Sequence, residues 1–347
     1  MSGVKCIDNR DKRKNARKRR TGWIVFLSVV LAVLCIAAGG IYYFKEIDIV
    51  PEHLVADYIS SSYRNSWYRD ILYTENLCVA SDNVSLENAP DMTGVSAAAL
   101  FNLDDSQVDF AYNIHQRVYP ASTTKILTAL LALKHGNLED VVTVSYNADA
   151  DRFAKDESTC GIKTGDRLTL KDLLCGLLMQ SGNDTAVAIA EYIGGSNEAF
   201  VQMMNEQAAE LKASQSHFVN SNGLHNDNHY TTAYDLYLIF NECVKYPDFV
   251  SIIETKEYTA HVTGADGAIR DMKFEPTNFY ALGEVSPPDN VTIIGGKTGT
   301  TKSAGNCLIL LEKTLDGKPY ISIIMGAESK KLLYQDMNAV IQAIPAG

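Results

Sequence analysis

The chain has 347 residues, of which 46% are hydrophobic and 21% charged, and its formal net charge is −11. The chain has 31 basic and 42 acidic residues. Nine basic and two acidic residues lie in the first 20 positions, which leaves 22 basic and 40 acidic residues in the rest of the chain. So acidic a remainder repels polyanions, which argues against nucleic acid as a partner. The seven cysteines are scattered without a Cys-x-x-Cys pair, so we expect mostly buried thiols instead of a disulfide framework or a zinc site.

The first segment predicts a membrane anchor. Residues 1–22 form a basic tail, and residues 23–44 contain no charge, with Trp23 at one end and Tyr43 near the other. Twenty-two such residues suffice for a helix that crosses a lipid bilayer, with aromatic side chains at both interfaces. Because basic residues stay in the cytoplasm, we expect a single-pass protein of the cell membrane whose remaining chain is extracytoplasmic. A cleaved signal peptide is the alternative, since residues 37–40 are small.

Residues 45–76 show no evident chemistry and are interpreted as a stalk, and residues 77–347 as the folded domain. Two strands at 97–103 and 108–113 form an expected hairpin. Helices are then expected after Pro120 and at 170–179, 184–193, 197–211 and 232–246. Further strands are expected at 257–262, 269–274, 291–300, 306–313 and 320–326, followed by a last helix at 330–344. Strands at both ends with helices between them predict an α+β fold whose sheet is completed by the first hairpin.

Ser122 and Lys125 lie at the start of the helix that follows Pro120, before an apolar run at 126–133. A serine and a lysine three residues apart share one helix face, so the amine can approach the hydroxyl. A helix N-terminus also favours the negative charge that appears if Ser122 attacks a carbonyl group. The spacing alone leaves a second interpretation open, in which the serine caps the helix and the lysine is solvated.

Two later motifs are also polar and lie at ends of predicted elements. Ser181-Gly182-Asn183 occupies a tight turn between two helices, where Asn183 can alternatively cap the second helix. Lys297-Thr298-Gly299-Thr300 ends an apolar strand, and Gly299 lets another backbone come close to it. Similar triplets at 81–83 and 163–165 lack these flanking elements.

In this order, separated by 59 and 116 residues, the three motifs resemble those of serine D-alanyl-D-alanine carboxypeptidases, the low-molecular-mass penicillin-binding proteins. The resemblance covers about residues 96–326. It implies a helical cluster packed on an antiparallel sheet, with the motifs at their junction and residues 77–347 as the catalytic domain. We expect no cofactor and no metal. Many members have a β-rich second domain and a membrane-associating C-terminal helix; we expect neither here, so that residues 23–44 provide the tether to the lipid bilayer.

The resemblance also implies roles for the motif residues. Ser122 attacks the carbonyl carbon of the penultimate D-alanine in a peptidoglycan stem peptide, and Lys125 is the base. Lys297 is a second cation that lowers the pKa of Lys125, together with burial. Ser181 relays a proton to the departing D-alanine, and Asn183 orients Lys125 or the substrate amide.

The strand motif is expected to bind the substrate. Thr298 and Thr300, with the lysine before them, hold the terminal carboxylate, and Gly299 allows the close approach. The backbone N–H groups of Thr300 and the nucleophile form the oxyanion hole. β-Lactams are expected to acylate the same serine. In class A β-lactamases the glutamate that drives deacylation is followed by asparagine three residues later. Neither Glu206 nor Glu210 is followed by asparagine in this way, so we expect the adduct to persist.

Alternatives remain open at this point. The same pocket would serve a receptor that binds stem peptides or β-lactams without turnover, an endopeptidase acting on cross-links, or a β-lactamase. His225 and His229, four residues apart in a polar loop, are a weaker hypothesis for a zinc site. His115 is interpreted as structural.

Overall fold

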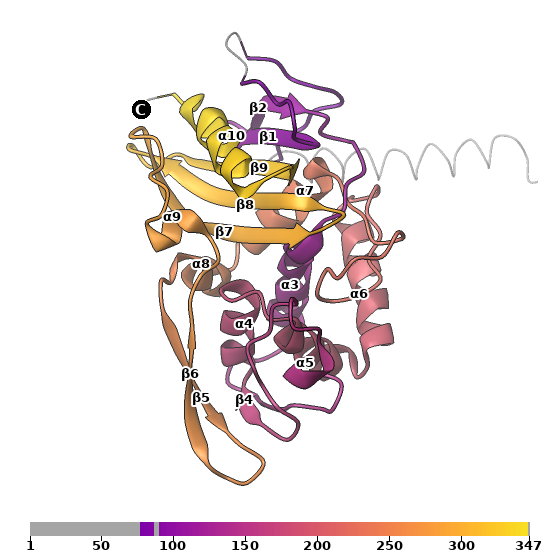
Figure 1. Ribbon diagram of the computed structural model, residues 1–347. Coiled ribbons are helices and arrows are strands. Elements are labelled where there is room, and N and C mark those ends of the chain that lie inside the picture. Colours follow the sequence, from indigo (N-terminus) through magenta and orange to yellow (C-terminus); the bar gives the residue numbers. More distant parts are fainter. Residues whose placement is uncertain (1–76, 87–89, 346–347) are drawn as a thin grey trace, which may run out of the picture. The chain divides into compact units, whose positions relative to one another are not determined.

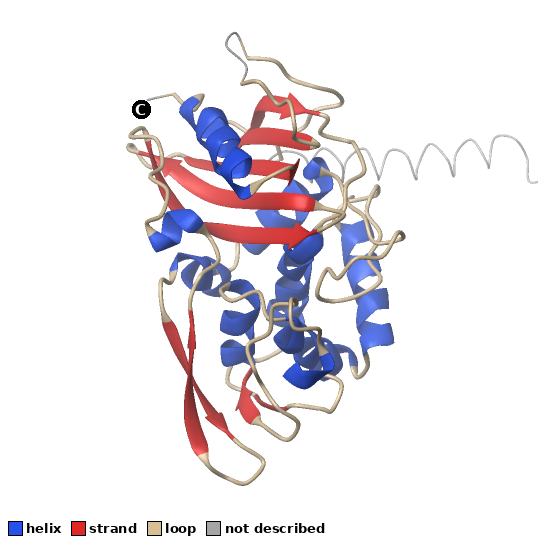
Figure 2. Ribbon diagram, in the orientation of Figure 1, coloured by secondary structure: helices blue, strands red, loops and turns tan. Residues whose placement is uncertain are grey.

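The structure, a computed structural model, describes residues 77–86 and 90–345. Its larger sheet has five antiparallel strands in the order β2-β1-β9-β8-β7 (Figure 1, Figure 2). These strands are β1 (Ala97–Asn102), β2 (Gln107–Tyr112), β7 (Val291–Thr301), β8 (Gly305–Thr314) and β9 (Pro319–Ala327). The first hairpin joins strands from the other end of the chain, since Ala99 of β1 lies opposite Ile323 of β9. The predicted α+β class and the completion of the sheet by this hairpin are confirmed.

Helices cover both faces of this sheet. In Figure 1, α10 (Lys330–Gln342) lies in front of the sheet and α7 (Ala233–Cys243) behind it. Met337 and Ile341 of α10 pack in one apolar cluster with Leu308 and Leu310 of β8. Helix α7 contacts β1 and β9. Because both faces are covered, β1, β8 and β9 are almost continuously buried and apolar instead of alternating.

The helical cluster is built around α3, whose first eight residues are all buried. A helix that is buried on every side lies at the centre of a bundle, and α3 can be buried in this way because its sequence is mostly apolar. Thr169 forms the predicted cap of α4, in a capping box with Asp172. The cluster comprises η1 (Ala121–Thr124), α3 (Lys125–His135), η2 (Ala150–Arg152), α4 (Leu170–Leu178), α5 (Asn183–Gly194), α6 (Asn197–Glu210), α7 and α8 (Pro247–Glu254), and the short α9 (Phe279–Leu282) follows later in the chain.

The expectation of one sheet is wrong for two strands. β5 (Tyr258–Thr263) and β6 (Ile269–Phe274) belong to a second antiparallel sheet in the order β3-β4-β5-β6, with β3 (Val141–Thr143) and β4 (Arg167–Thr169). Side chains of β6 alternate between exposed and more buried positions. This pattern suits a sheet with one solvated face, whereas the central strands of the larger sheet are buried on both faces.

Several predictions about the N-terminal part lie outside the described residues: the tail at 1–22, the anchor at 23–44 and the stalk at 45–76. Within residues 77–86 and 90–345, no helix combines the length and the apolar character needed to cross a bilayer. The five cysteines in these ranges are buried free thiols, as expected: Cys78, Cys160, Cys175, Cys243 and Cys307.

Candidate active site

Ser122 lies in η1, a single 3₁₀ turn between Pro120 and the first residue of α3. The serine therefore precedes the α-helix instead of lying inside its first turn. Ala121 beside it has a φ of +49°, which is costly for a residue with a Cβ atom. Strain of this kind persists only where the surroundings hold it. Here Gly223 is pressed against Ala121 so closely that a Cβ atom on Gly223 would lie 1.9 Å from the Ala121 carbonyl oxygen.

Lys125 is completely buried, and its Nζ atom contacts three acceptors. It lies 3.0 Å from Ser122 Oγ, 2.7 Å from Asn183 Oδ1 and 2.7 Å from the carbonyl oxygen of Asn222. Burial holds the pKa of Lys125 well below its usual value, and the charge of Lys297 lowers this pKa further. The two carbonyl oxygens can only accept hydrogen bonds, so a neutral amine donates both N–H groups to them. Its lone pair then faces the Ser122 hydroxyl, which is the geometry of a nucleophile and its base.

Lys297 is the second buried cation, 1% exposed. Its Nζ atom donates to Ser181 Oγ at 2.9 Å and to the carbonyl oxygen of Thr298 at 3.0 Å. Burial lowers the pKa of Lys297 to about 7. The hydroxyl oxygen of Ser181 accepts a hydrogen bond from Lys297, so its own O–H can donate elsewhere. Ser181 has a φ of +64°, so it is a second strained residue at the same site.

Asn183 does not act as the helix cap that the sequence also allowed. The N-cap of α5 is Gly182, without a side-chain hydrogen bond, and Asn183 is the first residue of the helix. Its side chain accepts a hydrogen bond from Lys125 instead. The structure therefore favours the interpretation in which Asn183 orients the amine.

The strand motif reaches this cluster because Gly299 has no side chain. A Cβ atom on Gly299 would lie 3.0 Å from both the Ser122 backbone nitrogen and the Pro120 carbonyl oxygen. Contacts this short are tighter than Cβ atoms normally make, so a side chain here would push β7 and η1 apart by at least a few tenths of an ångström. The backbone N–H of Ser122 thus lies at the edge of β7, beside Thr300.

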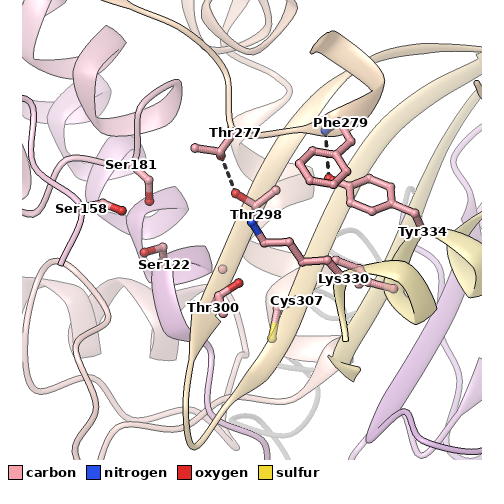
Figure 3. Close-up of a pocket in the computed structure, with 12 residues that line it drawn as sticks. Ser122, Ser158, Ser181, Thr277, Phe279, Thr298, Thr300, Cys307, Lys330 and Tyr334 are labelled. Atoms are coloured by element: carbon pink, nitrogen blue, oxygen red, sulfur yellow. Dashed lines mark hydrogen bonds between the residues drawn. The ribbon is translucent and has the colours of Figure 1, made fainter. Parts of the chain in front are cut away.

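A pocket of about 200 Å³ opens over these residues (Figure 3). Figure 3 shows Ser122 and Ser181 on one side, with Thr298 and Thr300 of β7 opposite them. Within the described part of the chain, no Asp or Glu lines this pocket. The lining residues are Ser122, Ser158, Ser181, Thr277, Phe279, Thr298, Gly299, Thr300, Cys307, Lys330, Leu333 and Tyr334.

Some contributors to the site were not predicted from the sequence. The Asn222 carbonyl oxygen, Ser158 and Lys330 carry no motif signal, since their place depends on distant packing. Asp184 is a further addition. Its buried carboxylate accepts N–H groups of Cys160 and the next two residues, and so fixes the loop that carries Ser158. Burial raises the pKa of Asp184. Its position directly after the serine motif was the only available signal.

The two histidines suggested for zinc are used differently. His229 is buried; its Nδ1 atom accepts the N–H of Val219 at 3.1 Å, so Nε2 carries the proton and donates to Thr124 Oγ1 at 2.8 Å. Burial lowers the pKa of His229 to about 4. His225 is exposed, pairs with Asp227 at 3.4 Å and lies nearly perpendicular to the Tyr119 ring, with ring centres 4.7 Å apart. Both nitrogens of His229 are occupied by protein groups, which leaves neither for a metal.

Comparisons with known proteins agree with this site. Residues 84–329 match the family described as D-alanyl-D-alanine carboxypeptidase. The chain belongs to this family. It is 34% identical over 241 residues to D-alanyl-D-alanine carboxypeptidase DacF of Bacillus subtilis, covering 68% of this chain and 58% of that protein. It is 33% identical over 216 residues to the D-alanyl-D-alanine carboxypeptidase of Streptomyces sp. K15, covering 60% of this chain and 72% of that protein.

A solved structure is also similar. The crystal structure of the Streptomyces K15 DD-transpeptidase superposes with a TM-score of 0.66 and 27% identity, covering 72% of this chain and 96% of that chain. The match to DacD of Escherichia coli spans 63% of that protein's length, and the match to DacF spans 58%. The chain thus spans about three fifths of the length of these curated relatives. Family membership and fold follow from these matches.

Proposed function

We propose that this protein is a serine DD-carboxypeptidase that removes the terminal D-alanine from peptidoglycan stem pentapeptides through an acyl-enzyme on Ser122. The observation that supports this function best is the buried Lys125 amine, 3.0 Å from the Ser122 hydroxyl and anchored by two carbonyl oxygens. This arrangement turns an ordinary hydroxyl into a nucleophile without a histidine. The catalytic groups are Ser122, Lys125, Ser181, Asn183 and Lys297.

In the acylation step, neutral Lys125 takes the proton of Ser122 while the serine oxygen attacks the carbonyl carbon of the penultimate D-alanine. Negative charge develops on the carbonyl oxygen, where the N–H groups of Ser122 and Thr300 stabilise it. The C–N bond then breaks. The hydroxyl of Ser181 gives its own proton to the leaving nitrogen and takes one from Lys297, which donates a hydrogen bond to it, while Lys125 keeps the proton of Ser122; D-alanine therefore departs as a neutral amine.

Water then attacks the ester carbonyl of the acyl-enzyme and releases the shortened peptide, which completes the cycle. A β-lactam places its amide where the peptide bond lies and acylates Ser122 in the same way. Within the described residues no carboxylate lines the pocket, and Glu206 and Glu210 are exposed on α6. We therefore expect the β-lactam adduct to persist, which opposes the β-lactamase alternative.

The placement in the cell belongs to the same proposal. Residues 23–44 anchor the chain in the cell membrane as a single-pass helix, and the catalytic domain faces the peptidoglycan outside. Support comes from the charge pattern: a basic tail precedes the apolar segment and an acidic remainder follows it.

The test is release of D-alanine from a stem pentapeptide by the full-length protein in detergent, with Ser122→Ala as control. Release by the unmodified protein alone supports a carboxypeptidase. Labelling by fluorescent penicillin without release of D-alanine would support the receptor alternative, and cleavage only of cross-linked dimers would support an endopeptidase. The similar solved structure is called a DD-transpeptidase, an enzyme that transfers the acyl group to an amine. One of the assay mixtures therefore also contains an amine acceptor.

A further inference from the structure

A second pocket lies beside the active site and contains none of its catalytic residues. Its volume is about 590 Å³, against about 200 Å³ for the pocket over Ser122, and it falls in the size range of ligand sites. We call it the flanking pocket; it is lined by residues of the segments 116–119 and 227–230 and of the turn at 303–304, together with Ser96. Within the described part of the chain, its charged lining residues are Arg117 and Asp227, so it suits a charged ligand.

The flanking pocket begins where the active-site pocket ends. Thr300 lies near the end of β7 and lines the active-site pocket, whereas Ser303 and Ala304 follow β7 and line the flanking pocket. Tyr119 also lines the flanking pocket, three residues before Ser122. Three residues of chain span at most about 11 Å, so the two pockets are neighbours.

The direction in which the substrate crosses the site points its acyl part toward the flanking pocket. In the proposed function, on which this inference rests, the terminal carboxylate lies beside Thr298 and the scissile carbonyl beside the N–H groups of Ser122 and Thr300. The rest of the peptide then continues past Thr300 toward Ser303. β7 is an edge strand of its sheet, which leaves room for an extended peptide beside it. Such a peptide advances about 3.3 Å per residue, so the flanking pocket lies about two or three residues upstream of the scissile bond.

Arg117 is the charged group that the flanking pocket offers to a ligand. It is exposed, and its guanidinium carbon lies 4.5 Å from the centre of the Tyr230 ring, in a cation–π contact. Tyr230 is itself fixed, since its backbone N–H and carbonyl groups both hydrogen-bond to the backbone of His217. No salt bridge between described residues includes Arg117, whereas Asp227 lies 3.4 Å from His225. A guanidinium group positioned by a ring and without an acidic partner suits a carboxylate, which it can bind with two parallel hydrogen bonds.

We propose that the flanking pocket binds the upstream part of the stem peptide and that Arg117 binds a side-chain carboxylate there. The leaving D-alanine lies on the other side of the scissile bond and takes no part in this contact. The enzyme therefore distinguishes stem peptides by the charge of an upstream side chain. A peptide that carries a carboxylate at this position is cleaved faster than the same peptide with a carboxamide, which offers the guanidinium group no negative charge.

The experiment compares two substrates that differ only in this charge: N-acetyl-L-glutamyl-D-alanyl-D-alanine and its L-glutaminyl counterpart. With the full-length protein, kcat/KM for release of D-alanine from the acid should exceed that for the amide by about fivefold. Arg117→Gln should abolish this difference by lowering kcat/KM for the acid alone, and Arg117→Lys should retain part of it.

Two further variants separate the charge of Arg117 from its packing on Tyr230. Lys302→Gln is the matched control, because Lys302 is an exposed cation next to Ser303 that lines neither pocket, and it should keep the difference. Ser303→Glu leaves the guanidinium group in place and adds a negative charge to the pocket wall, so it should also lower kcat/KM for the acid more than for the amide. Thermal unfolding of each variant checks that it is folded.

Equal kcat/KM for the two peptides, a difference that survives in Arg117→Gln, or its loss in Lys302→Gln would overturn the role of Arg117 and leave the carboxypeptidase function intact. If the unmodified protein releases D-alanine from neither peptide, the proposed function fails. The subsite is then tested through acylation by two penicillins whose acyl side chains are adipoyl, which ends in a carboxylate, and its terminal carboxamide. Faster acylation by the acid that Arg117→Gln removes would still support the subsite. Equal rates, or acylation by neither penicillin, would refute it.

Discussion

Asn183 provides the sharpest test of how Lys125 acts as a base. Its Oδ1 atom accepts from Lys125 Nζ at 2.7 Å, in a position where both residues are buried. Asn183→Leu keeps a similar volume and removes the acceptor. A buried donor left without a partner costs about 1–3 kcal/mol, and each 1.36 kcal/mol changes a rate tenfold. If this free energy is lost from the transition state of acylation, because the Lys125 amine is no longer oriented, acylation should slow by about 5- to 150-fold.

Asn183→Asp is the informative partner of that variant. It keeps an oxygen acceptor but adds a negative charge next to Lys125, which favours the protonated amine and raises its pKa. The neutral fraction at pH 7 falls, and it recovers as pH rises through the raised pKa. Acylation by Asn183→Asp should therefore be slow near neutral pH and approach the rate of the unmodified protein at high pH. Asn183→Leu should remain slow throughout.

The assay is the second-order rate constant for acylation by a fluorescent penicillin, measured over a pH series that runs from neutral to alkaline. Thermal unfolding of each variant serves as the control for folding. An Asn183→Leu variant that acylates as fast as the unmodified protein would refute the orienting role. A profile of Asn183→Asp displaced to lower pH would contradict Lys125 as the base.

Three further predictions concern the surroundings of this pair. His229→Gln can accept from Val219 and donate to Thr124 as the histidine does, so it should acylate within a few-fold of the unmodified protein, whereas His229→Leu should lose at least about tenfold. Because the pKa of His229 is lowered from 6.5 to about 4 on folding, the unfolded chain binds the proton more readily, and stability should fall as pH drops through this window; thermal melts of His229→Gln should show a smaller fall. Gly299→Ala should cost about 1–3 kcal/mol in urea unfolding and slow acylation, because its Cβ atom would press on the Ser122 backbone; unchanged acylation would contradict the close packing of β7 on η1.

Much of the site was predictable because its parts are short and local. Ser122 and Lys125 meet across one turn, and Ser181 and Asn183 share one connection between helices. Their convergence with Lys297 was expected from the family resemblance and not from the spacing itself. The larger sheet was predictable because its strands are long, apolar and bounded by turn residues.

What sequence reasoning missed depends on distant packing. β3 and β4 have three residues each, too few to show a period. No element was predicted between the helix at 232–246 and the strand at 257–262, although Pro247 stands at the first turn of α8, where proline is favoured. The third acceptor of Lys125 is a main-chain oxygen at Asn222, and any residue has such an atom, so its identity carries no signal.

The most direct test of the account is the position of the covalent adduct. The full-length protein is incubated with a β-lactam, digested, and its acylated peptide is identified by mass spectrometry. We predict a single adduct on Ser122 that is absent from Ser122→Ala and strongly slowed in Lys125→Met. An adduct on another residue, or an undiminished rate without the Lys125 amine, would contradict the proposal that this buried lysine activates Ser122.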